Sequence, residues 1–148
     1  MLDEKKDLLC FSCGQMIYAV ELPYVAEICF DAKLYKIPCL PEYFRGVYHY
    51  RGKILAVICM DEKSQEDTAK TRTEKVLLIL KYRKYLFCIG LKEEPFLTTV
   101  SRENLAVDTL SQLSSDIWEK KDIYSKDGNL ISLLDLKKII EKLSGHQG

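Results

Sequence analysis

The chain has 148 residues, which is the usual size of one globular domain. Apolar residues make up 47% of it and charged residues 30%, as in ordinary soluble proteins. The 22 basic residues balance the 22 acidic residues, so the sequence lacks the basic excess on which nucleic-acid binding draws.

The N-terminal sequence MLDEKKDLL is charged and has no continuous apolar run, so we expect no signal peptide. No stretch approaches the roughly 18 apolar residues that a membrane helix needs. We therefore expect a cytoplasmic protein that does not insert into a membrane. Its six cysteines should then be reduced thiols, and most of them lie in apolar runs where cysteine packs as a small hydrophobe.

The first elements are short. Leu8–Cys13 and Met16–Glu21 are two β-type runs around Gly14, and a glycine at the first turn position favours a type II′ hairpin. The proline that follows predicts a short helical turn over Tyr24–Ile28. Leu34–Ile37 is then predicted to form another strand.

The next segment is dense in turn signals. Pro41 can open a single helical turn that Gly46 closes. Two β-rich runs follow, Val47–Tyr50 and Lys53–Cys59, and they meet at Arg51-Gly52. This pattern predicts a hairpin with an arginine at its tip.

The middle of the chain alternates between a polar segment and strands. Residues 61–74 are polar and predict an exposed loop. Val76–Tyr82 and Tyr85–Leu91 predict a pair of strands, and Phe96–Val100 predicts a further one. Residues 101–115 carry no clear signal.

The C-terminal part predicts a hairpin and a helix. Ile117–Tyr124 and Asn129–Leu134 are joined across Asp127-Gly128, the strongest short hairpin signal in the chain. Asp135 can cap a helix whose apolar residues, from Leu136 to Leu143, follow helical spacing. Many short strands, glycine turns and one real helix together predict a barrel-type β fold.

The segment Ile37–Met60 resembles the core motif of the CheW-like domain family, which occurs in chemotaxis coupling proteins and in the regulatory end of the histidine kinase CheA. The residues that carry the resemblance are Ile37, Pro41, Tyr43, Gly46, Val47, Arg51, Gly52, Ile54, Val57 and Ile58. Weaker matches at 18–20, 25–28 and 128–136 extend it over nearly the whole chain.

The resemblance implies a single CheW-like domain over residues 1–148. Its fold would be mostly β, with two small five-stranded SH3-like β-barrels packed together, short helices and a C-terminal helix. It also implies a non-catalytic adaptor, without cofactor or metal, that couples methyl-accepting chemoreceptors to CheA. The expected partners are the regulatory domain of CheA and the cytoplasmic tip of the receptors. The residues that we expect at partner-binding surfaces are Glu27, Tyr43, Gly46, Val47, Arg51, Gly52, Ile54 and Val57.

Among the residues expected at partner-binding surfaces, Arg51, Glu27 and Ile54 carry specific expectations. Arg51 is either a solvated turn residue or, as the resemblance implies, part of a receptor-facing surface; a guanidinium there can make bidentate contacts. The resemblance places Glu27 on a short helix, and we expect it to approach Arg51. Strand alternation should turn some apolar residues of the hairpin outward, above all Ile54, to form a docking patch.

The chain also departs from the family pattern. Ala56 stands where the family often has proline, and Cys59 where it often has aspartate. The stretch Cys88–Glu94 is divergent as well. A CheW-like module that serves a non-chemotactic kinase pathway therefore remains an alternative.

A cysteine-based redox or metal enzyme is the alternative from another class. Cys10 and Cys13 have the CxxC spacing, but residues i and i+3 of a strand face opposite sides of a sheet, so core packing is favoured. No second CxxC completes a zinc site. His49 is not accompanied by a nucleophile motif, which argues against its use in catalysis.

Overall fold

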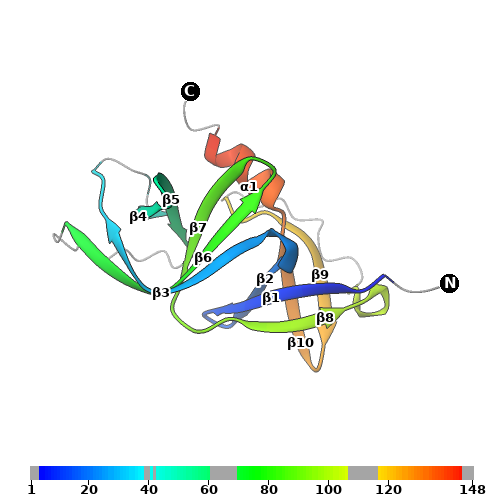
Figure 1. Cartoon of the computed structure of the whole chain (residues 1–148). Coiled ribbons are helices and arrows are strands. Elements are labelled where there is room, and N and C mark those ends of the chain that lie inside the picture. The colour runs from blue at the N-terminus through cyan, green and yellow to red at the C-terminus, as the bar shows by residue number, and fades with distance from the viewer. Residues whose placement is uncertain (1–3, 39–40, 42, 61–69, 107–116, 145–148) are drawn as a thin grey trace. The chain divides into compact units, whose positions relative to one another are not determined.

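The chain divides into two compact units (Figure 1), seen in a computed structural model that describes residues 4–38, 41, 43–60, 70–106 and 117–144. Unit 1 combines both ends of the chain, Met1–Tyr24 and Pro95–Gly148. Unit 2 is the continuous middle of the chain, Val25–Glu94. Each unit is built on its own set of five strands.

Unit 1 holds a five-stranded sheet in the order β8-β1-β2-β10-β9, in which only β2 and β10 run parallel among these neighbours. Its elements are β1 (Lys6–Cys13), β2 (Met16–Glu21), the 3-10 helix η1 (Leu22–Tyr24), β8 (Phe96–Val100), the 3-10 helix η2 (Arg102–Asn104), β9 (Lys120–Lys126), β10 (Asn129–Leu134) and α1 (Leu136–Ser144). The predicted hairpins around Gly14 and Asp127-Gly128 are both confirmed.

The two edge strands of this sheet approach each other. The ammonium group of Lys126 on β9 donates a hydrogen bond to the carbonyl oxygen of Thr99 on β8. Just after β8, the amide of Ala106 donates to the carbonyl oxygen of Ile123 at 2.8 Å, and Leu105 forms an isolated bridge with Tyr124. The sheet therefore curls toward a barrel, as the predicted fold requires.

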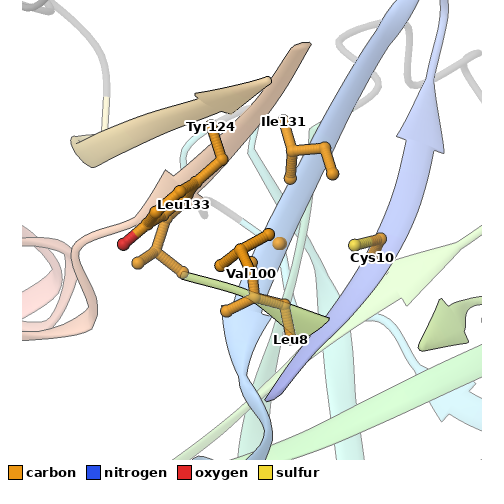
Figure 2. Packing of buried hydrophobic residues seen from close by; sticks show 7 residues of the cluster. Leu8, Cys10, Val100, Tyr124, Ile131 and Leu133 are labelled. Atoms are coloured by element: carbon orange, nitrogen blue, oxygen red, sulfur yellow. The ribbon is translucent and has the colours of Figure 1, made fainter. Parts of the chain in front are cut away.

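Alternate residues of the strands make the core of unit 1 (Figure 2). Leu8 and Cys10 are two apart on β1, so both point to the same face, and both are fully buried. They pack with residues from the other four strands: Ala19, Val100, Tyr124, Ile131 and Leu133. Burial raises the pKa of the Cys10 thiol to about 11, so this cysteine is a neutral core residue at pH 7.

The C-terminal helix begins with the predicted cap. The Asp135 carboxylate accepts a hydrogen bond from the amide of Lys138 at 3.0 Å. The helix buries the apolar face predicted from its spacing, including Leu136, Ile139 and Ile140. The cap satisfies one of the amides that the first helical turn leaves without an intrahelical partner.

We expect Asp135→Ala to lower the free energy of unfolding by about 1 kcal/mol, because the amide of Lys138 loses its acceptor. Urea denaturation followed by the fluorescence of Trp118, the single tryptophan, measures this change. Asp135→Asn, which keeps a capping oxygen, is the control and should lose much less. Equal losses in the two variants would contradict a capping role.

Unit 2 is a closed barrel in the order β3-β4-β5-β7-β6, in which β5 and β7 are parallel. Its strands are β3 (Val25–Tyr35), β4 (Phe44–Tyr50), β5 (Lys53–Cys59), β6 (Thr71–Tyr82) and β7 (Tyr85–Leu91). Its core contains Ala32, Leu34, Leu55, Val57, Leu77, Ile79 and Cys88. The predicted fold class, mostly β with two five-stranded assemblies and a C-terminal helix, is confirmed.

The helical turn predicted over Tyr24–Ile28 is wrong. The 3-10 helix ends at Tyr24, and β3 begins at Val25. Val25 and Ile28 pair with Leu80 and Leu78 of β6, and this long antiparallel ladder outweighs the local turn signal of the proline. The strand predicted at 34–37 is the end of β3, which stops at Tyr35.

Two further predictions, a loop and a helical turn, also need correction. Of the loop predicted over 61–74, residues 61–69 lie outside the described part of the chain, but Thr71–Glu74 belongs to β6. These residues pair with the end of β3, so polar side chains occur on a barrel strand. Pro41 does open a turn, since its carbonyl accepts from the amide of Phe44 at 2.9 Å, but Gly46 does not close a helix and lies inside β4.

Candidate docking surface

The hairpin β4–β5 positions most of the residues predicted at a partner surface. Its turn residues Arg51 and Gly52 have φ angles of 49° and 78°, and two successive residues with positive φ are typical of a type I′ turn. The predicted hairpin with arginine at its tip is therefore confirmed. The Arg51 side chain is 77% exposed and stacks over the ring of Tyr50, with 5.2 Å between the guanidinium carbon and the ring centroid.

Glu27 and Arg51 lie close together, as expected. The distance between Glu27 Oε1 and Arg51 Nη2 is 3.7 Å. Glu27 lies on strand β3, however, and not on the short helix that the resemblance implied. Both side chains are substantially exposed, so solvent screening leaves the pair worth well under about 1 kcal/mol of stability.

A thiol and a phenol extend this ion pair. The thiol of Cys29 donates to Glu27 Oε2 at 3.6 Å, and the hydroxyl of Tyr48 donates to Cys29 Sγ at 3.9 Å. Burial raises the pKa of the Cys29 thiol, which keeps its hydrogen for donation at pH 7. Among the described residues, β3 and β4 share one backbone ladder pair, Tyr35 with Val47. These side-chain contacts therefore join β3 to the hairpin where few backbone hydrogen bonds do so.

An apolar patch lies on the outer face of the same hairpin. Ile54 is 65% exposed, and its cross-strand partner His49 is exposed too. The ring of Tyr35 lies 5.5 Å from the imidazole ring of His49, and Tyr35 pairs with half-buried Val47. We call Tyr35, Val47, His49 and Ile54 the β4–β5 patch. Its amphipathic aromatic and aliphatic content is typical of protein-docking surfaces.

The remaining predicted residues are less exposed. Val57 is fully buried in the core of unit 2 and Gly46 is buried in β4, so neither presents a side chain to a partner. Tyr43 is half-buried, with its ring 5.0 Å from that of Phe44. The predicted set thus separates into surface residues of the hairpin and residues that support them from within.

Sequence reasoning missed three contributors: Tyr35, Cys29 and Tyr48. Tyr35 reaches the patch through the pairing of β3 with β4, which no local pattern reveals. Cys29 and Tyr48 depend on the same long-range approach. Alternation could have identified His49, because an outward Ile54 requires an outward cross-strand partner.

Two buried cysteines of unit 2 do not have the lowered pKa of a reactive thiol. Burial raises the pKa of Cys59 to about 11 and that of Cys88 to about 12, the opposite of the shift that makes a thiolate nucleophile. Cys10 and Cys13 occupy one strand, with Cys10 in the core. Over the described ranges, no cluster of three or more histidine, cysteine or acidic residues is placed to hold a metal ion.

The comparisons with known proteins identify the family of the chain. A family model described as "CheW-like domain" matches residues 7–144. The chain belongs to the CheW-like domain family. In this CheW-like domain, the hairpin β4–β5 with Arg51, Gly52 and Ile54 is the segment that carried the resemblance in the sequence.

One relative and one solved structure are informative. The chain is 30% identical over 61 residues to "Chemotaxis protein CheW" of Treponema pallidum (strain Nichols), a match that spans 41% of this chain and 36% of that protein. The crystal structure of the scaffolding protein TtCheW from Thermoanaerobacter tengcongensis has the same fold, with a TM-score of 0.74 and 19% identity over 93% of this chain and 94% of that one. Among the described residues, no helix is long and apolar enough to cross a membrane.

Proposed function

We propose that this CheW-like domain is a cytoplasmic, non-catalytic adaptor that couples methyl-accepting chemoreceptors to the histidine kinase CheA. The observation that carries the proposal is the hairpin β4–β5, which presents the exposed β4–β5 patch beside the ion pair of Glu27 and Arg51. Family membership over residues 7–144 supports it. Similarity to a chemotaxis protein and to a scaffolding protein supports it further.

The two features suit different contributions to binding. The β4–β5 patch, with the exposed aliphatic side chain of Ile54, supplies apolar area that would dock on the regulatory domain of CheA. The charged tip, with Glu27 and Arg51, would set specificity on the side that faces the receptor tip, because exposed charges favour specificity more than affinity. A body that binds both partners raises the effective concentration of kinase at the receptor, and no bond needs to be made or broken.

The docking of CheA is tested by Ile54→Asp. A carboxylate within the β4–β5 patch should weaken binding of the CheA regulatory domain at least about thirtyfold, because a hot-spot residue contributes about 2 kcal/mol. Isothermal titration calorimetry measures this loss. The matched control is Leu130→Asp, which places the same charge at a leucine of unit 1 that is 60% exposed, and it should bind as the unmodified chain does. Equal affinity of the two variants would refute docking through this patch.

The receptor side is tested by a double-mutant cycle on Glu27 and Arg51. We expect Glu27→Gln and Arg51→Gln each to weaken binding of a receptor-tip fragment, and the double variant to lose less than the sum. The expected coupling energy is about 0.5–1 kcal/mol, since the pair is exposed. Strictly additive losses of binding free energy would show that the ion pair does not contribute to the receptor-facing surface.

Part of the divergent stretch Cys88–Glu94 is packed inside the barrel, and its last three residues are exposed. Cys88 is a core residue of unit 2, and Gly90 lies against the buried side chain of Glu74. Packing within the barrel accounts for Cys88 and Gly90, whereas the exposed residues Lys92, Glu93 and Glu94 leave a CheW-like module of a non-chemotactic kinase pathway as the alternative. A non-chemotactic kinase as partner would be revealed by binding of that kinase in place of CheA.

A further inference from the structure

A β-bulge in β4 aims an arginine at a buried thiol. The register between β4 and β5 shifts between Phe44 and Gly46, so Arg45 is the extra residue. A bulge re-aims the side chain of its extra residue. Here the guanidinium Nε of Arg45 donates a hydrogen bond to Cys59 Sγ at 3.0 Å. The bulge thus directs Arg45 toward the end of β5.

The thiol of Cys59 continues the contact to two further strands. Its sulfur lies 4.0 Å from Glu74 Oε1 on β6 and 3.8 Å from the carbonyl oxygen of Gly90 on β7, and it can donate its one hydrogen to either. Burial, partly opposed by Arg45, raises the pKa of Cys59, so the thiol stays neutral. The contact therefore joins β4, β5, β6 and β7 through side chains.

Glu74 is the anionic member of this group. The residue is only 7% exposed, and its Oε2 lies 3.8 Å from Arg72 Nε. A buried carboxylate is tolerated only where cations or hydrogen-bond donors compensate its desolvation. The barrel also reserves space for it, because a Cβ at Gly90 would lie 2.8 Å from Glu74 Oε1.

We propose that Arg45, Cys59, Glu74 and Gly90 form a buried polar anchor that positions residues 43–47 of the candidate docking surface. Cys59 stands where the family often has aspartate, so the carboxylate that complements Arg45 is supplied here from residue 74 on β6, across a neutral thiol. Only the link to docking rests on the proposed function.

The test places a carboxylate at position 59 and removes the one at position 74. Cys59→Asp adds a second carboxylate beside Glu74, and Glu74→Gln removes the anion. Each single variant should speed hydrogen exchange of the amides at 44–47 by about tenfold or more. The double variant Cys59→Asp/Glu74→Gln should recover most of the protection, because one carboxylate and the cation Arg45 then face each other again. Cys59→Ser is the neutral control and should exchange nearly as the unmodified chain does.

Several results would overturn the anchor. One is a double variant whose loss of exchange protection equals the sum of the losses in the two single variants. Another is unchanged hydrogen exchange at 44–47 in Glu74→Gln. If both variants that carry Cys59→Asp fail to fold, Glu74→Gln and Cys59→Ser still test the anchor. We expect faster hydrogen exchange at 44–47 in Glu74→Gln and nearly unchanged exchange in Cys59→Ser. Calorimetry of Glu74→Gln with the CheA regulatory domain tests the link to docking separately. If the unmodified chain does not bind that domain, the proposed function fails while the exchange result still stands.

Discussion

Gly46→Ala is expected to lower the free energy of unfolding by roughly 2–5 kcal/mol. At φ 147° the backbone of this residue lies in a region that side chains rarely adopt, and a Cβ would lie 2.6 Å from the carbonyl oxygen of Tyr35. The carbonyl belongs to the backbone of β3 and cannot rotate away, so the barrel must deform at the β3–β4 junction. Urea denaturation followed by Trp118 fluorescence measures the loss.

Gly52→Ala is the matched control for this prediction. Gly52 also has a positive φ, 78°, but a Cβ there has no neighbour within 4 Å. It should lose only about 1 kcal/mol, from the backbone conformation alone. A difference of less than about 1 kcal/mol between the two variants would show that the close approach at Tyr35 does not control the stability of β4.

Alkaline pH is expected to destabilise the fold through its buried thiols. Burial raises the pKa of Cys10 and Cys59 to about 11 and that of Cys88 to about 12, from an ordinary value of 9.0. Because the folded-state values exceed the unfolded ones, the stabilisation is complete below pH 9 and is lost as the pH rises toward the folded values. Between pH 8 and pH 10, these three thiols should together lower the free energy of unfolding by about 4 kcal/mol.

Urea midpoints at pH 8, 9 and 10 test the size and the sign of this effect. Cys88→Ala is the informative control: its stability is lower throughout because of the cavity, but its pH dependence should be shallower, since one of the thiols with a raised pKa is gone. An unchanged slope in this variant, or a midpoint that rises between pH 8 and 10, would contradict burial of these thiols as neutral groups.

The strands and turns of this fold were largely predictable because their signals are local. Gly14, Arg51-Gly52 and Asp127-Gly128 mark hairpins that the structure confirms, since turn geometry selects these residues directly. The helical turn predicted after Pro23 was wrong for the opposite reason. Its conformation is decided by pairing of β3 with β6, about fifty residues away in sequence, and local preference gives way to such pairing.

The candidate site was predictable only in part. The resemblance pointed to Arg51 and Glu27, and alternation pointed to an outward Ile54. The contribution of Tyr35 and the anchor of Arg45, Cys59 and Glu74 require the closed barrel, because their members come from different strands. Val57 fits the family motif yet is buried, which shows that a motif mixes docking residues with the packing that supports them.

The central claim is that one CheW-like domain binds a kinase and a receptor at the same time. Size-exclusion chromatography with light scattering, performed on this chain with the CheA regulatory domain and a receptor-tip fragment, singly and together, tests it most directly. We predict a ternary complex whose mass equals the sum of the three components, and no kinase–receptor complex when this chain is omitted. Failure to bind either fragment, or displacement of one fragment by the other, would contradict the account.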